Sequence, residues 1–147
     1  VHGVIKMQSR RFNNGQTLAI KLDVGDEIVS CVLKVARDYH ILSGTVSGLG
    51  AVRSAEIGLF DPSDRIYHKT ALTQPMEIAS LTGNLSTKDG EPYAHLHIVL
   101  GDIHGNAFGG HLSQSVIGAT AEIFIQVFPD VIERVFSEEI GLNLMKF

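Results

Sequence analysis

The sequence has 147 residues, a formal net charge of −4 at pH 7 and one cysteine, Cys31. This length fits a single domain over residues 1–147, while a lone cysteine excludes an internal disulfide framework and suits the cytoplasm. An acidic chain is poorly equipped for non-specific nucleic-acid binding, which depends on lysine and arginine. No apolar run approaches about 18 residues and no secretion signal is recognisable, so we expect neither membrane insertion nor export.

The first feature along the chain is a small basic group formed by Lys6, Arg10 and Arg11. Two interpretations stay open for it. We favour a solvated segment, given the acidic net charge of the chain. The alternative is a local basic face, which assembly of several copies would concentrate for contact with nucleic acid.

A strand and then a helix are predicted next. The segment 17–23, TLAIKLD, alternates apolar and polar residues as a half-buried strand does. Asp26 is the expected N-cap of the helix that follows, and Gly44 stands where a left-handed residue ends the helix or begins the next turn. The residues at helical spacing on one side are Ile28, Val32, Val35, Ala36 and Tyr39.

The rest of the chain predicts short strands separated by polar or glycine-bearing turns. One strand, SAEIGLF at 54–60, places Ala55, Ile57 and Leu59 on one face, and DPSD at 61–64 is a turn. Further strands are predicted over 65–69, 76–86, 93–101, 106–112, 120–128 and 142–147. The fold class is therefore α+β, an antiparallel-rich sheet sandwich or partial barrel with one main helix.

Three histidines stand in the apolar segment 94–112, AHLHIVLGDIHGNAFGGHL. His95 and His97 point to the same face of a strand because side chains alternate. A three-residue hairpin loop with Gly105 in the left-handed conformation pairs His97 with His111, so that the three imidazoles meet. A two-residue loop shifts the register by one and turns His111 away.

Two interpretations of these histidines remain open. Three neutral imidazoles leave one position free on a tetrahedral zinc ion, although manganese, nickel, copper or iron also accept such ligands. The alternative is a pair of solvated strand residues and a third histidine bonded to backbone. Glu77, in PMEIASLTG, is either a solvent-facing strand residue or, if its strand crosses near the histidines, a proton-transfer group.

Five segments in this order resemble the plant and prokaryote conserved (PPC) domain: GDEI, ILSGTVSGLGAVRSAEIGLFD, MEIASLTGNLS, HLHIVLGDIHGNAFGGHL and TAEIFI. The resemblance covers nearly the whole chain from about Leu22 onward. It implies a compact α+β domain, a homotrimer, and a histidine cluster matching His95, His97 and His111. Plant members join the domain to an AT-hook and are treated as nuclear DNA-binding proteins, whereas this chain has no Arg-Gly-Arg-Pro hook. The fold is also similar to that of acetolactate decarboxylase, which holds zinc through histidines.

Three functions follow. The first is a trimeric PPC-domain protein that binds a divalent metal, most simply zinc, and acts as a DNA-binding or regulatory module with DNA or a protein as its partner. The second is a zinc-dependent lyase or hydrolase acting on a small oxygen-rich metabolite, with Glu77 moving the proton. The third is a trimeric structural domain whose histidines hold no ion.

Overall fold

A computed structural model describes residues 7–147, so Lys6 of the basic group lies outside the described residues. One helix, α1 (Ile28–Asp38), accompanies nine strands in this range. The strands are β1 (Gln8–Phe12), β2 (Thr17–Asp23), β3 (Gly44–Asp61), β4 (Ile66–Leu72), β5 (Met76–Lys88), β6 (Glu91–Gly101), β7 (Ala107–Val127), β8 (Glu133–Ser137) and β9 (Leu142–Lys146). A 3-10 turn, Asn13–Gly15, joins the first two strands.

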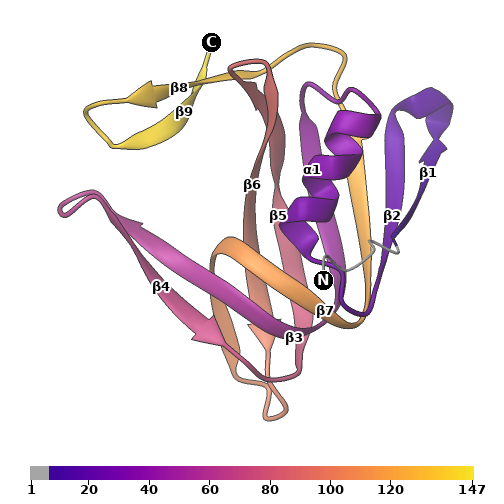
Figure 1. Ribbon diagram of the computed structural model, residues 1–147, viewed down its shortest axis with the longest axis vertical. Helices are drawn as coiled ribbons and strands as arrows, with labels where there is room; N and C mark the ends of the chain where they lie inside the picture. The colour runs from indigo at the N-terminus through magenta and orange to yellow at the C-terminus, as the bar shows by residue number, and fades with distance from the viewer. Residues whose placement is uncertain (1–6) are drawn as a thin grey trace.

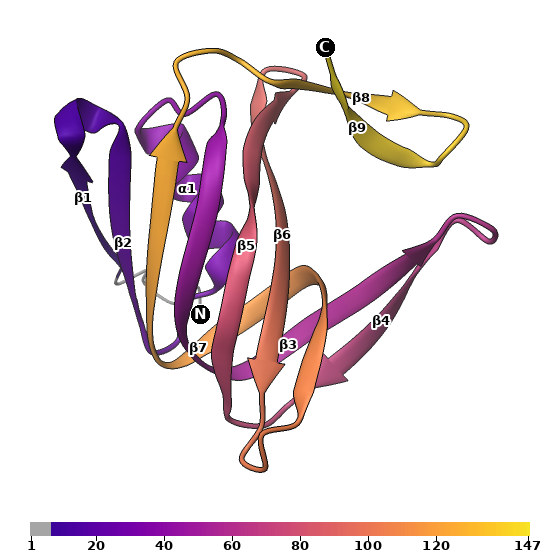
Figure 2. The ribbon, with the colours of Figure 1, turned by 180° about the vertical axis from the view of Figure 1, so that it is seen from behind.

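The strands form one sheet that curls back on itself. β3 pairs with β5 and β7, and β6 also pairs with β5 and β7, so four strands make a closed ring of hydrogen-bonded neighbours. These pairings are antiparallel, but the ring is not a regular barrel because β3 and β7 bend across it (Figure 2). The predicted α+β class, rich in antiparallel strands and with one main helix, is confirmed.

The helix covers one face of this sheet, while two hairpins reach away from it (Figure 1). Its buried side chains are those of Ile28, Cys31, Val32, Val35 and Ala36. The β3–β4 hairpin and the β8–β9 hairpin both extend on the side of the molecule opposite β1 and β2. No α-helix other than this one of 11 residues occurs in the described range, and it is too short to cross a bilayer.

The structure corrects both predicted ends of the helix. Glu27, not Asp26, is the N-cap, and its carboxylate accepts hydrogen bonds from the backbone N–H groups of Val29 and Ser30. Asp26 instead accepts from the N–H of Asp23 at 2.9 Å, inside the preceding turn. The left-handed residue after the helix is His40, with φ 55°, whereas Gly44 begins β3.

Two predicted strands proved to be one. The strands predicted over 106–112 and 120–128 both fall in β7, apart from their outer residues Asn106 and Phe128, and its 21 residues run without a break. β3 is likewise 18 residues long, and shifts in its register with β7 near Val52, Ser54 and Ile57 allow both strands to bend together. Beyond the bend, Leu59 is 64% exposed, although Ala55 and Ile57 on the same predicted face are buried.

Candidate metal centre

The β6–β7 hairpin sets the register on which the histidine hypothesis depends. The backbone N–H of Asp102 donates to the carbonyl of Asn106 at 3.0 Å, which leaves a loop of three residues, and Gly105 has φ 78°. His97 is therefore paired with His111, as predicted for a three-residue loop. The Asp102 carboxylate fixes the loop further by accepting from the N–H groups of His104 and Asn106, both at 2.9 Å.

The three predicted histidines converge. Leu96 points into the core and is buried, so His95 and His97 lie on the opposite face of β6. The ring centroids of His95 and His97 are 5.1 Å apart, and those of His111 lie 5.5 Å from His95 and 5.8 Å from His97. One nitrogen of each ring lies within 4.8 Å of the others, an arrangement that could hold a metal ion.

His111 carries an unusual polar atom. Its Nδ1 is buried and has no hydrogen-bond partner among the described residues. The ring is covered by Tyr67 of β4, with ring centroids 4.9 Å apart. Because a buried nitrogen without a partner costs free energy, it calls for a partner outside the chain, and a metal ion at the histidines fits that need.

The electrostatics favour the neutral imidazoles that a metal ion requires. The pKa of His95 is lowered to about 4. Burial is the main cause, and the positive charges of Arg134, His97 and His111 add to it. Burial also lowers the pKa of His111, with smaller contributions from His97 and Lys69. Both rings are therefore uncharged at neutral pH.

These pKa shifts predict how acid affects the metal-free protein. The folded-state pKa of His95 is about 4 and an unfolded histidine titrates near 6.5, so between these values the unfolded chain binds more protons. The free energy of unfolding should thus fall as pH drops from about 6.5 towards 4, with His95 contributing on the order of 1–2 kcal/mol after solvent screening. Urea unfolding of chelator-treated protein at pH 7 and pH 5 measures this change.

His95→Gln should flatten this acid dependence, whereas His104→Gln should keep it because His104 lies in the exposed hairpin loop. Equal pH dependence in the two variants would contradict the assigned environment of His95.

A pocket of about 460 Å³ opens over the histidines. It is lined by the β3–β4 hairpin, by β6 and β7, and by one residue of β9; its side chains besides the three histidines are Leu59, Phe60, Pro62, Tyr67 and Leu142. Gly110, on its floor, serves strand packing, since a Cβ there would lie 2.7 Å from the carbonyl oxygen of Gly58 in β3. The histidines thus line a hollow whose other side chains are largely apolar.

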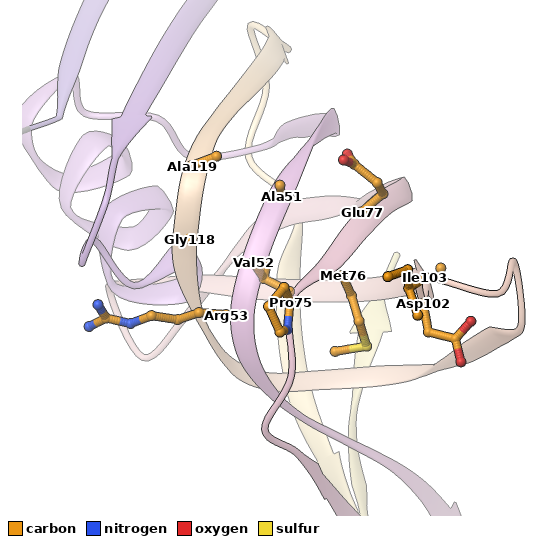
Figure 3. A pocket seen from close by; sticks show the side chains of 11 residues that line it. Ala51, Val52, Arg53, Pro75, Met76, Glu77, Asp102, Ile103, Gly118 and Ala119 are labelled. Carbon is orange, nitrogen blue, oxygen red and sulfur yellow. The ribbon is translucent and has the colours of Figure 1, made fainter.

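Glu77 does not join this cluster. It lines a separate pocket of about 350 Å³ with Arg53 and Asp102 (Figure 3). Glu77 is paired with Gly101, four residues along β6 from His97, which corresponds to about 13 Å of extended strand. In Figure 3 the Arg53 guanidinium points away from both carboxylates, so the pocket does not gather a catalytic group of residues.

A second group of ligand-type side chains lies in the β3–β4 turn. His68 and Asp64 approach at 2.6 Å between Nε2 and Oδ2, and Asp61 accepts from both the N–H and the hydroxyl of Ser63. The Ser63 bonds lower the pKa of the Asp61 carboxyl. These contacts hold the turn that DPSD predicted, and they leave His68 at the surface.

Sequence reasoning missed three neighbours of the histidines, which are Tyr67, Asn84 and Arg134. Tyr67 reaches His111 from the β3–β4 hairpin, and Arg134 comes from β8. Asn84 was within a predicted strand, but only the β5–β6 register places it opposite His95. No spacing along the chain signals these contacts, because they arise from strands that meet only in the folded sheet.

Both the sequence and the fold are similar to those of known proteins. The Plants and Prokaryotes Conserved (PCC) domain, the PPC family of the resemblance above, matches residues 9–129. A proposed DNA-binding protein from Bacteroides thetaiotaomicron is 28% identical with a TM-score of 0.92, over 96% of this chain and 97% of that one. A metal-containing protein from Archaeoglobus fulgidus is 32% identical with a TM-score of 0.82, over 99% of both chains.

Two further similarities cover only part of the other protein. The bifunctional protein GlmU of Synechococcus is 31% identical over 122 residues, which are 82% of this chain but only 18% of that protein's length. A Staphylococcus aureus protein similar to alpha-acetolactate decarboxylase shares the fold, at 15% identity and a TM-score of 0.55, over 76% of this chain and 52% of that one. The family model matches residues 9–129, and the structural similarity to the Bacteroides thetaiotaomicron protein covers 96% of the chain. The chain therefore belongs to the Plants and Prokaryotes Conserved domain family.

Proposed function

We propose that this PPC domain, formed by residues 1–147, binds one divalent metal ion through His95, His97 and His111 and acts as a regulatory module. The observation that carries the proposal is the convergence of three imidazoles, together with the buried Nδ1 of His111, which has no hydrogen-bond partner among the described residues. Zinc suits three neutral histidines, and it would keep a fourth position open for a ligand. The metal-containing relative from Archaeoglobus fulgidus supports a metal in this fold.

Metal content tests the proposal directly. Protein purified without a histidine tag should carry about one zinc ion per chain, measured by plasma mass spectrometry. His97→Ala should lose it, because two remaining imidazoles hold zinc far more weakly. His104→Ala, which removes a histidine from the exposed hairpin loop, is the matched control and should keep the metal. Wild-type protein that stays metal-free after zinc loading would overturn the proposal.

A regulatory role is favoured over the lyase or hydrolase alternative. That chemistry needs a second titratable group within hydrogen-bond reach of the open metal position. Glu77, the expected group, lines another pocket, and none of the described residues lining the histidine pocket is acidic. The titratable side chain that lines this pocket besides the histidines is Tyr67, and burial raises the pKa of its phenol away from neutrality. The geometry therefore supports ligand binding at the ion better than proton transfer.

We propose that the active form is a homotrimer in the cytoplasm. The PPC resemblance implies the trimer, and exposed apolar side chains on the β8–β9 hairpin suit burial against another copy. They are Val135, Phe136, Leu144 and Met145. The lone, buried Cys31 agrees with a reducing compartment.

DNA is the partner we propose for this assembly, through the exposed strand β1. Its Arg10 and Arg11 belong to the predicted basic group, and their guanidinium groups lie over the rings of Phe12 and Tyr39 at 4.8 and 4.5 Å. A trimer repeats this pair of cations three times, so that weak phosphate contacts add. The proposed DNA-binding relative from Bacteroides thetaiotaomicron supports the same partner.

Binding to duplex DNA should therefore depend on salt and on assembly. Two phosphate contacts per chain predict at least about a tenfold loss of affinity between about 50 and about 200 mM salt. Arg11→Gln should weaken binding and reduce the salt dependence, while Arg53→Gln, which removes an exposed cation of β3 at the Glu77 pocket, should not. Fluorescence anisotropy measures the affinity and light scattering the mass. A single-chain mass, or no binding at low salt, would contradict this role.

A further inference from the structure

Arg134 is a buried cation without an acidic partner. Only 8% of the residue is exposed, and its guanidinium donates to the Ser86 hydroxyl at 2.7 Å, to the Asn143 carbonyl at 2.9 Å and to Oδ1 of Asn84 at 2.9 Å. All three acceptors are neutral, and no described carboxylate forms an ion pair with it. Because a buried charge is costly when uncompensated, this one calls for an anion nearby.

This cation adjoins the histidine site. Asn84, which binds it, lies opposite His95 in the β5–β6 register. Arg134 also stacks over the ring of Tyr93 at 4.8 Å, and Tyr93 precedes His95 by two residues on the same face of β6. A small cavity of about 220 Å³ is lined by Thr82, Gly83, Asn84 and two of the histidines. Fixed positive charge therefore stands beside the proposed metal.

The groups around the histidines offer donors and no negative charge. Oδ1 of Asn84 accepts from Arg134, so the amide's NH₂ group remains as a donor. Thr82 adds a hydroxyl to the small cavity, and Tyr67 adds a phenol to the larger pocket. None of the described residues lining either hollow is aspartate or glutamate. A divalent ion on three neutral imidazoles would bring the local charge to about +3, with Arg134 included.

The shape of the larger pocket narrows the kind of anion. Its wall beyond the histidines includes Leu59, Phe60, Pro62 and Leu142, and its volume of about 460 Å³ is in the range of small-molecule sites. Inorganic phosphate would leave this apolar wall uncovered. A short organic carboxylate would satisfy both the charge and the wall, with its head at the ion and its body against the apolar side chains.

We infer that the histidine site takes a small organic carboxylate as its ligand, with Arg134 supplying fixed positive charge and Leu59 and Phe60 receiving the ligand's apolar body. This inference rests on the proposed metal binding. The ligand would be the signal that the regulatory module reads.

Cobalt(II)-loaded protein titrated with isobutyrate tests the inference, because the visible spectrum of cobalt reports ligands entering its coordination sphere. Asn84→Asp is the decisive variant, since it is isosteric and places a carboxylate against Arg134 where the amide oxygen lies at 2.9 Å. It should bind cobalt with unchanged stoichiometry yet bind isobutyrate at least about tenfold more weakly. Asn14→Asp is the matched control, since the same charge enters an exposed turn with φ 55°, a conformation that aspartate tolerates.

The apolar wall has its own measurement. Wild-type protein should prefer isobutyrate to acetate by about fivefold, because two extra methyl groups are buried. Leu59→Ser, at a largely exposed position where folding should persist, should remove most of that preference. An unchanged preference would overturn the role of the wall.

The outcomes separate this inference from the proposed function. Wild-type protein that binds no cobalt would overturn the metal site and the inference together. Cobalt bound with no spectral response to isobutyrate up to about 100 mM would overturn the inference and leave the metal site standing. Equal isobutyrate affinity in Asn84→Asp and Asn14→Asp would overturn the role of Arg134.

Discussion

Gly83→Ala should destabilise the protein by about 3 kcal/mol or more and displace the histidine site. Gly83 lies in β5 beside β6, and a Cβ at this position would overlap the backbone carbonyl oxygen of His95. It would also lie 2.9 Å from both Cα and Cδ2 of Leu96. A side-chain rotation cannot relieve contacts with backbone, so β6 must move away, and His95 moves with it.

Gly101→Ala is the matched control for this substitution. Gly101, like Gly83, is a glycine within a strand, here β6. A Cβ at Gly101 would meet no atom within 4 Å, and its φ lies outside the left-handed region. Its effect on the free energy of unfolding should stay within about 0.5 kcal/mol. Urea unfolding of both variants, with metal analysis of the folded fractions, measures the difference. If the two alanines cost the same, the close approach of β5 and β6 at His95 would be contradicted.

The elements predicted well are those specified by local patterns. The alternation in 17–23 is β2 itself, and the helical spacing from Ile28 to Ala36 marks the buried face of α1. The elements predicted poorly owe their form to distant partners. β7 was divided because its alternation changes phase between Leu112 and Ser115, which are both buried, where its register with β3 shifts. β1 and β8 are five-residue strands, and every residue of β1 is exposed, so their sequences carry little apolar pattern.

The same distinction explains the site. The convergence of His95, His97 and His111 could be predicted from the sequence, because one hairpin holds all three residues and Gly105 fixes its loop. Strand alternation gives the face of a residue but not the neighbour that crosses it, so Arg134 of β8 and Tyr67 of β4 escaped prediction. Glu77 is the opposite case. Its carboxylate was a suitable proton-transfer candidate on the neighbouring strand β5, but the strand register pairs it with Gly101 at the end of β6, away from the histidines.

His111→Phe should reverse the stability ranking of variant and wild type, depending on zinc. Without metal, the wild-type protein carries the buried, unpartnered Nδ1 of His111. Phenylalanine removes that atom and keeps a ring against Tyr67, so the metal-free variant should be about 1 kcal/mol more stable than metal-free wild type. The cost of the nitrogen is expected at a position selected for binding rather than for stability.

Zinc should then favour the wild type alone. At a free zinc concentration of about 1,000 times its dissociation constant, binding to the folded state adds about 4 kcal/mol to the free energy of unfolding. His111→Phe offers only two imidazoles and should gain little of this. Urea unfolding with chelator and with buffered zinc gives all four values, so the expected reversal is read within one experiment. If the wild type were more stable than the variant by the same amount in both conditions, His111 would support the fold by packing. The proposal that it ligates zinc would then be contradicted.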